Sequence, residues 1–287
     1  MEIKNIELMQ QKIYEQELNY KEEYPHSKGE KCYIFFSSNG IDKNISEDKY
    51  WEELVEKNKF EWQSIANSLK YHKNLGKIIY VRDVFKKFYI DGINIKIDSV
   101  DKLLGFLKEV TKGYKVTTVG ISSGGYLATI CAIKLRAERA FCISGQFDIQ
   151  SRLQDVNEDM LSLDKKKYLN IQWLLEENEN IPIYYFCPIG CAHDWDNYQL
   201  VKNDKNVKTF MFPDKVHAAT VYPFNFPDIL FKSNQKMDKL FCHYESKVIN
   251  KNEFYVRTVT FNGLFIFIKH IITTRFDLRK LKKNWEV

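Results

Sequence analysis

A serine in a glycine-framed turn is the residue of this chain best suited to covalent chemistry. The pentapeptide Gly120-Ile121-Ser122-Ser123-Gly124 follows residues 115–119, a run rich in β-branched side chains. A G-x-S-x-G turn between a strand and a helix holds its serine in a strained conformation, and side chains two positions away on either side would collide. Centring the motif on Ser123 would put Ile121 at one of these positions. The pattern therefore predicts Ser122 as a nucleophile, and a purely structural glycine-rich turn is the alternative.

A histidine and two carboxylates that could activate this serine follow it in the chain. His217 comes just after the strand-like residues 207–212, and Asp194 and Asp196 come after the preceding strand-like run. Nucleophile, acid and histidine in this order form one known arrangement of a serine triad. We predict His217 as the general base. We prefer Asp196 as the acid because it begins the helix-like stretch 196–201, and Asp194 is the alternative.

Acyl transfer also needs hydrogen-bond donors aimed at the oxyanion of the tetrahedral intermediate. The backbone N–H of Ser123 is one candidate. The second is expected from the loop after the apolar run 32–36, where the backbone N–H of Asn39 or Gly40 occupies the required place. An ordinary Asn-Gly turn is the alternative for this loop.

Strand-like and helix-like segments alternate on both sides of the serine, and this alternation predicts how it is positioned. A mostly parallel central sheet with helices on both faces follows, and functional loops gather at the carboxyl ends of its strands. We expect one α/β domain over residues 1–287, a three-layer sandwich with an N-terminal arm (1–30), a small helical cap (146–180) and a C-terminal amphipathic extension (250–287). The expected strands are 32–36, 77–81, 115–119, 139–144, 181–187 and 207–212, and the expected helices include 51–69 and 100–110.

The composition is that of an ordinary globular protein. Of the 287 residues, 44% are hydrophobic and 28% are charged, which argues against a disordered or fibrous chain. Lys and Arg number 43 against 38 Asp and Glu, and the resulting net charge of +5 suits an anionic partner. The chain shows no nucleic-acid-binding motif, so we expect no nucleic-acid partner.

The cysteines and the N-terminus bear on the compartment and on metal binding. The six cysteines are scattered, as expected for reduced thiols in the cytoplasm. Cys187, Cys191 and His193 with Cys242 or His243 do not have the spacing of zinc ligands, so we expect no metal site. Residues 1–5 are polar, and we expect no cleaved secretion signal and a cytoplasmic location.

Taken together, these residues give the chain a resemblance to α/β-hydrolase-fold proteins over roughly residues 32–225. Segments 35–40, 120–126 and 194–196 further resemble bacterial capsule polysaccharide O-acetyltransferases with a Ser-His-Asp triad. The resemblance implies acetyl-CoA as the donor substrate, no permanently bound cofactor, and an anionic surface polysaccharide as the acceptor. The His-Gly-Gly-Gly sequence of lipases and esterases is missing ahead of the turn.

Two other functions remain open on the sequence, as does the oligomeric state. The same triad would serve an esterase acting on carbohydrate or small esters, and a non-catalytic partner in polysaccharide assembly or secretion could keep the fold without the chemistry. The apolar residues 264–268 precede the cations Arg275, Arg279, Lys280, Lys282 and Lys283 in a segment too short and too charged to span a bilayer. This segment suggests peripheral association with the inner membrane face or a capsule-assembly complex, and a last helix packed on the domain is the alternative.

Overall fold

A seven-stranded sheet forms the middle layer of the molecule. The computed structural model describes residues 2–16, 19–38, 49, 51–153, 161–218, 220 and 225–260. The strands are β1 (Tyr20–Glu23), β2 (Lys31–Phe36), β3 (Leu75–Val81), β4 (Lys115–Ile121), β5 (Arg139–Ile143), β6 (Ile183–Pro188) and β7 (Val207–Phe212). They are arranged in the order β1-β3-β2-β4-β5-β6-β7. Only β1 pairs antiparallel with its neighbour, so the other six strands end at the same edge of the sheet.

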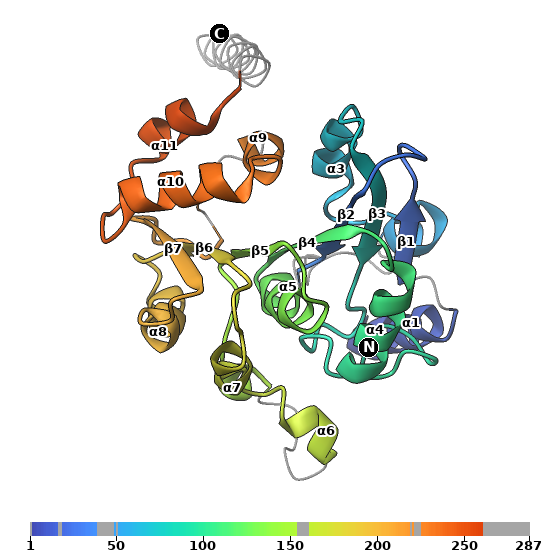
Figure 1. The fold of residues 1–287 in the computed structure, drawn as a ribbon. Helices are drawn as coiled ribbons and strands as arrows, with labels where there is room; N and C mark the ends of the chain where they lie inside the picture. Colours follow the sequence, from blue (N-terminus) through green and yellow to red (C-terminus); the bar gives the residue numbers. More distant parts are fainter. Residues whose placement is uncertain are drawn as a thin grey trace, which may run out of the picture.

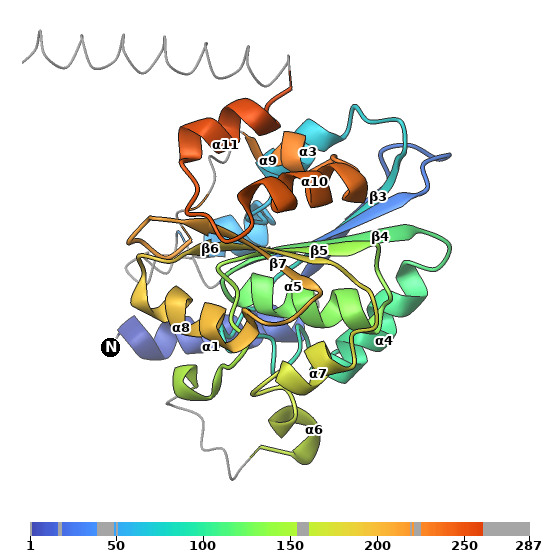
Figure 2. The same cartoon turned by 60° about the vertical axis from the view of Figure 1, so that its left-hand side comes forward.

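Helices cover both faces of this sheet. The helices are α1 (Glu2–Glu15), α3 (Gln63–Leu69), α4 (Val100–Val110), α5 (Ser123–Lys134), α6 (Leu163–Lys166), α7 (Gln172–Glu176), α8 (Ala192–Val201), α9 (Phe226–Leu230), α10 (Asn234–Tyr244) and α11 (Lys251–Thr258), with the short helices η1 (Glu52–Glu56) and η2 (Gln150–Arg152). Helices α3, α9, α10 and α11 lie on one face, and α1, α4, α5, α7 and α8 lie on the other (Figures 1 and 2). The predicted three-layer α/β sandwich with a mostly parallel central sheet is therefore confirmed.

Each face of the sheet buries its own hydrophobic core. On the α5 side, the core combines aliphatic strand residues with the almost fully buried helix α5. On the α10 side, it is largely aromatic, and Phe186 stacks on Phe210 at 5.0 Å and lies edge-on to Phe254 at 6.2 Å. A strand whose side chains are buried on both faces reads as a continuous apolar run, which explains why the central strands were visible in the sequence.

The predicted helix at residues 51–69 is wrong in its middle. The structure breaks it into η1 and α3, and Asn58 adopts a left-handed φ of 42° between them. The guanidinium of buried Arg82 donates hydrogen bonds to the carbonyls of Leu54 and Lys59, at 2.9 and 3.1 Å. This tertiary contact fixes the backbone in a path that a continuous helix could not follow.

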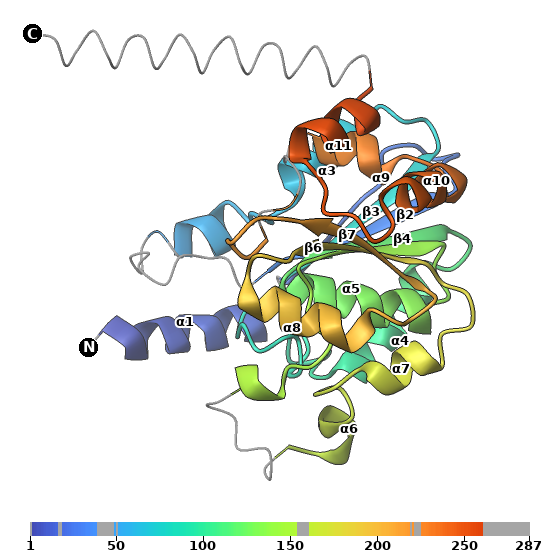
Figure 3. The same ribbon diagram turned by 90° about the vertical axis from the view of Figure 1, so that its left-hand side faces the viewer.

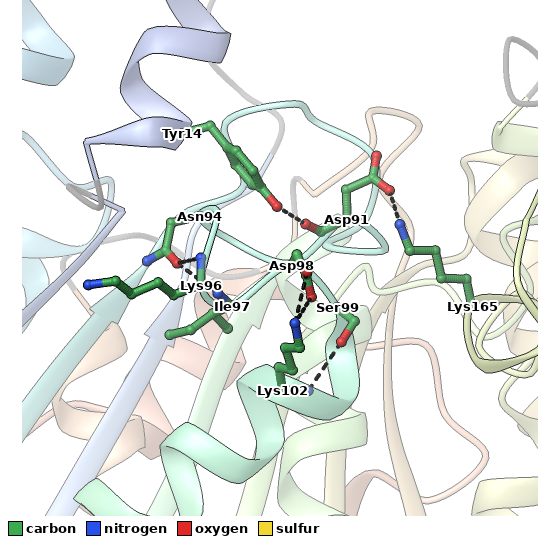
Figure 4. A network of polar contacts seen from close by, with 9 residues as sticks. All are labelled: Tyr14, Asp91, Asn94, Lys96, Ile97, Asp98, Ser99, Lys102 and Lys165. Carbon is green, nitrogen blue, oxygen red and sulfur yellow. Dashed lines mark hydrogen bonds and ion pairs between the residues drawn. The ribbon is translucent and has the colours of Figure 1, made fainter.

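A polar network attaches α1 and α6 to the loop between β3 and α4 (Figure 4). The Tyr14 hydroxyl of α1 donates to the carbonyl of Asp91 at 2.8 Å, and Lys165 of α6 forms an ion pair with the Asp91 carboxylate at 2.6 Å. Ser99 caps α4 by accepting from the Lys102 N–H at 3.3 Å. Segments far apart in the sequence thus meet on one loop.

The two outer strands of the sheet are protected differently. Strand β1 is only four residues long and carries Lys21, Glu22 and Glu23. Beside β7, Val248 forms a parallel bridge with Met211, and the Ile249 N–H donates to the Met211 carbonyl at 2.7 Å. Short, charged or covered edge strands are common in soluble sheet proteins.

Several expectations about the chain ends and the cap stay predictions. Figure 3 shows α6 and α7 on the α5 side of the sheet, and the described part of the expected cap contains η2, α6 and α7. Of the expected C-terminal extension, α11 is described, whereas residues 261–287 lie outside the described residues. Among the described helices, none has the length and apolar character needed to cross a membrane.

The tight turn after β4 gives a first testable prediction. A Cβ added to Gly120 would lie 2.0 Å from the Gly124 carbonyl oxygen, whereas a Cβ on Gly105 in α4 would have no atom within 4 Å. Gly120→Ala should therefore lower the free energy of unfolding by about 3 kcal/mol or more. Gly105→Ala, the control, should raise it by about 0.5–1 kcal/mol. Urea unfolding measures both, and similar small effects of the two changes would contradict this account of the turn.

Candidate active site

Ser122 stands at the apex of the turn that joins β4 to α5. Its backbone has φ 54° and ψ −122°, a conformation that costs an L-residue strain and that persists only when the surroundings enforce it. The Ser122 N–H donates to the Ile143 carbonyl at 2.8 Å, and its carbonyl accepts from the Tyr126 N–H at 3.1 Å. A Cβ on Gly124 would lie 2.3 Å from the Phe36 carbonyl oxygen, so the start of α5 approaches β2 as closely as glycine permits.

Three side chains from different strand ends form one hydrogen-bonded chain. The His217 Nε2 lies 2.9 Å from the Ser122 Oγ, and the His217 Nδ1 lies 2.8 Å from the Asp194 Oδ2. The Asp194 side chain is 1% exposed and the His217 side chain is 35% exposed. A carboxylate can accept only from a protonated Nδ1, so this arrangement leaves Nε2 of the neutral imidazole free to accept the Ser122 proton.

The acid beside the imidazole is Asp194, and the preference for Asp196 is corrected. Helix α8 begins at Ala192, four positions before the start expected from the sequence, so Asp194 lies in its first turn. Two residues along a helix correspond to a rotation of about 200°. The buried side of α8 therefore receives Asp194, and Asp196 is exposed to solvent. A carboxylate in the first turn also interacts favourably with the helix dipole.

The loop after β7 that carries His217 is held at several points. The Ala218 N–H donates to the Ser144 Oγ at 3.1 Å, and both residues have left-handed φ angles, of 65° and 48°. Lys251 of α11 forms an ion pair with Asp214 at 2.7 Å. These contacts fix the backbone on both sides of the imidazole, which limits the freedom of His217 to turn away from Ser122.

His193 and Gln146 lie next to this chain and were not identified from the sequence as site residues. The His193 ring centre lies 5.8 Å from that of His217, and its Nε2 lies 3.1 Å from the Gln146 Nε2. The amide can donate to the ring nitrogen only when that nitrogen is unprotonated. Burial, reinforced by the charge of Arg152, lowers the pKa of His193 and favours this neutral form. The sequence signal that could have identified them is their position in the loops that follow β5 and β6.

The candidate oxyanion donors are only partly covered by the described residues. Ser123 is buried and begins α5, where backbone N–H groups form the positive end of the helix dipole. Asn39 and Gly40 lie outside the described residues. Ser38, just before them, is held by Glu61, whose carboxylate accepts from the Ser38 N–H at 2.5 Å and from its hydroxyl at 3.0 Å.

Two aromatic residues fix the start of the same loop. The Tyr89 hydroxyl donates to the Ser37 carbonyl at 2.7 Å, and the Trp62 Nε1–H donates to the Phe36 carbonyl at 2.9 Å. The donors in these contacts come from regions distant in the sequence, and no motif marks them. Sequence reasoning could therefore not have identified them or Glu61.

Among the described residues, the only cluster able to hold a metal ion overlaps this site. One ligand atom each from Cys191, Asp194 and His217 lies within 4.8 Å of the others. In the structure, the carboxylate and imidazole of this group are already engaged in the hydrogen bonds described above. Cys187 and Cys242, considered from the sequence, do not belong to the group. All six cysteines are free thiols.

Comparison with known proteins identifies similar structures but assigns no family. No family model matches the sequence, and no curated protein matches it. Solved structures similar to this chain include the capsule O-acetyltransferase of Neisseria meningitidis serogroup A, with 13% identity and a TM-score of 0.45 over 67% of this chain and 82% of that chain. Another is MGS-MChE2, an α/β hydrolase enzyme from the metagenome of lagoon sediments in Morocco, with 15% identity and a TM-score of 0.43 over 78% of this chain and 94% of that chain. A third is Est1E from Butyrivibrio proteoclasticus, with 11% identity and a TM-score of 0.41 over 67% of this chain and 82% of that chain.

The two aspartates of α8 provide a matched pair for testing the site. Asp194→Asn would turn the imidazole towards the wrong tautomer, and we expect cleavage of p-nitrophenyl acetate to slow by about 10⁴-fold, the loss known for serine triads. Asp196→Asn changes the same atoms on the exposed side of the helix and should leave the rate within about twofold. Equal losses from both changes, or an unaffected Asp194→Asn enzyme, would remove Asp194 from the mechanism.

Proposed function

We propose that this protein is a serine-dependent acyltransferase that O-acetylates a bacterial capsular or surface polysaccharide through an acetyl-Ser122 intermediate. One observation carries the acyl-transfer part of the proposal: a strained serine, an imidazole and a buried carboxylate are joined by hydrogen bonds of 2.9 and 2.8 Å. Acetyl-CoA as the donor and an anionic polysaccharide as the acceptor follow from the sequence resemblance.

The first half-reaction would acetylate the enzyme. The Ser122 Oγ attacks the thioester carbonyl while the His217 Nε2 takes the hydroxyl proton, and buried Asp194 stabilises the imidazolium that forms. The developing oxyanion is stabilised by the Ser123 N–H, with Asn39 or Gly40 as the second donor. Collapse of the intermediate breaks the carbon–sulfur bond, and the imidazolium protonates the departing CoA thiolate.

The second half-reaction would transfer the acetyl group to a hydroxyl. The acceptor hydroxyl loses its proton to the His217 Nε2 as its oxygen attacks the acetyl carbon, and Ser122 regains a proton when the ester bond to the enzyme breaks. A sugar hydroxyl makes the protein a transferase, and water makes it an esterase. The 35% exposure of the His217 side chain favours keeping hydrolysis as the second candidate, because water can reach the base.

The remaining parts of the proposal concern location. We place the protein in the cytoplasm, at the inner membrane face where surface polysaccharides are assembled. The net charge of +5 supports an association with anionic partners.

Acetyl-CoA turnover with and without polymer tests the reaction. We expect rapid mixing with acetyl-CoA to give an acetylated protein by intact-mass measurement, with the group mapped to the peptide containing Ser122. Capsular polymer should then accelerate CoA release and itself become acetylated. CoA release that does not change with polymer, together with free acetate, would assign the protein as a hydrolase.

Two substitutions separate the enzyme from a non-catalytic partner in polymer assembly. Ser122→Ala and His217→Ala should each lower turnover by on the order of 10⁴–10⁶-fold, since triad residues act as a unit. Thermal unfolding of each variant provides the control for folding. Unchanged polymer acetylation and assembly in cells carrying either variant would show that the protein acts without this chemistry.

A further inference from the structure

A basic hollow lies on the helical layer that faces away from α5. Its volume is about 490 Å³, and it is formed by α10, the turn before it, and α11, the helices at the top of Figure 2. The residues that line it are Lys232, Lys236, Lys239, Leu240, His243 and Arg257. Positions 236, 239 and 243 follow one another at helical spacing, so these side chains lie along one stripe of α10, and Lys232 lies in the turn before the helix.

The lysines of the basic hollow are not neutralised by neighbouring carboxylates of the described chain. Within the described residues, Lys232, Lys236 and Lys239 have no carboxylate oxygen within 4.0 Å, whereas Arg257 pairs with Glu253 at 3.0 Å. Among the described residues that line the basic hollow none is acidic, and the Glu253 carboxylate also lies 3.6 Å from the His243 Nε2. Burial lowers the pKa of Lys232, as does the charge of Lys236, against the opposing effect of Asp228. An anion bound here would favour the charged form of Lys232.

The backbone of the basic hollow is fixed from beneath. Arg139, which is 1% exposed, donates to the carbonyls of Lys232 and Leu230, the latter at 2.9 Å, and to the Asn234 Oδ1 at 2.9 Å. The turn between α9 and α10 is therefore anchored to the first residue of β5. The cations are held on a rigid surface, which reduces the entropy lost when they bind a partner.

The basic hollow is separate from the acyl-transfer site. The Asn234 side chain donates to the Glu138 carbonyl, so α10 begins beside the amino end of β5. Ser122 follows the carboxyl end of the neighbouring strand β4. An anionic group in the hollow would consequently not be the group that reacts at Ser122.

We propose that the basic hollow docks the protein on the phosphate headgroups of an anionic lipid bilayer, an inference that rests on the membrane-face location proposed above. The sequence that follows α11 supports a bilayer over a soluble polyanion. Arg257 lies one residue before the end of α11, and the chain continues beyond Thr260 with an apolar run at residues 264–268 and five cations between Arg275 and Lys283. Apolar and cationic residues together are what an anionic membrane surface binds. Each cation near such a surface strengthens binding by about fivefold.

Vesicle sedimentation with the full chain tests the proposal. The protein should bind vesicles that contain phosphatidylglycerol and bind phosphatidylcholine vesicles weakly, with the difference reduced by salt. The variant Lys232→Glu/Lys236→Glu/Lys239→Glu should lose about 100-fold or more in affinity. The control Lys108→Glu/Lys112→Glu/Lys205→Glu, at exposed lysines elsewhere, alters the net charge equally and should change affinity by much less.

Three outcomes would overturn the proposal. The first is absence of wild-type binding to the anionic vesicles, and the second is an equal loss of affinity in the two triple variants. The third is a Lys232→Glu/Lys236→Glu/Lys239→Glu protein that no longer binds a soluble anionic polymer but still binds the vesicles. Circular dichroism monitors folding, and Lys→Gln changes at the same three hollow positions replace the charge reversal if that variant unfolds. Acetyl-CoA turnover is measured in parallel, so that failure of membrane docking is distinguished from failure of the proposed chemistry.

Discussion

A contact between two pieces of backbone, at Gly120 and Gly124, is the constraint on which the candidate site depends. The chain reverses from β4 into α5 so tightly that a Cβ at Gly120 would lie only 2.0 Å from the Gly124 carbonyl oxygen. This packing holds Ser122 in its unfavourable φ of 54°. Strand β4 lies between β2 and β5, so the turn is supported on both sides. The strained residue therefore follows a strand that is hydrogen-bonded to a neighbouring strand on each side.

The other two members of the hydrogen-bonded chain reach Ser122 because parallel strands share an edge. Asp194 comes from the helix after β6, and His217 comes from the loop after β7. Each is held by contacts of its own: Asp194 by burial in the first turn of α8, and the His217 loop by the bond between Ala218 and Ser144. Burial of the carboxylate beside a half-exposed imidazole keeps its charge directed at that ring, because little water competes for it.

The sequence predicted the features that depend on local pattern. Apolar runs revealed the central strands, and the glycine frame identified Ser122. The four-residue strand β1 was missed because its residues are half-buried and charged, and it is ordered by pairing with β3. The break between η1 and α3 depends on distant Arg82. To choose between Asp194 and Asp196, the first residue of α8 had to be predicted to within two residues. Helix ends are the least certain part of a prediction from sequence pattern. Glu61, Tyr89 and Trp62 reach the loop after β2 only through tertiary packing.

The protection of the two outer strands also affects how copies of this chain could associate. At one side of the sheet, the charged strand β1 is too short to template a long partner strand, and at the other, the segment at Val248 and Ile249 occupies part of the hydrogen-bonding row of Met211. Both features disfavour extension of the sheet by strand addition. Self-association is then favoured at the outer surfaces of helices or loops, where shape and charge, rather than main-chain pairing, select the neighbour.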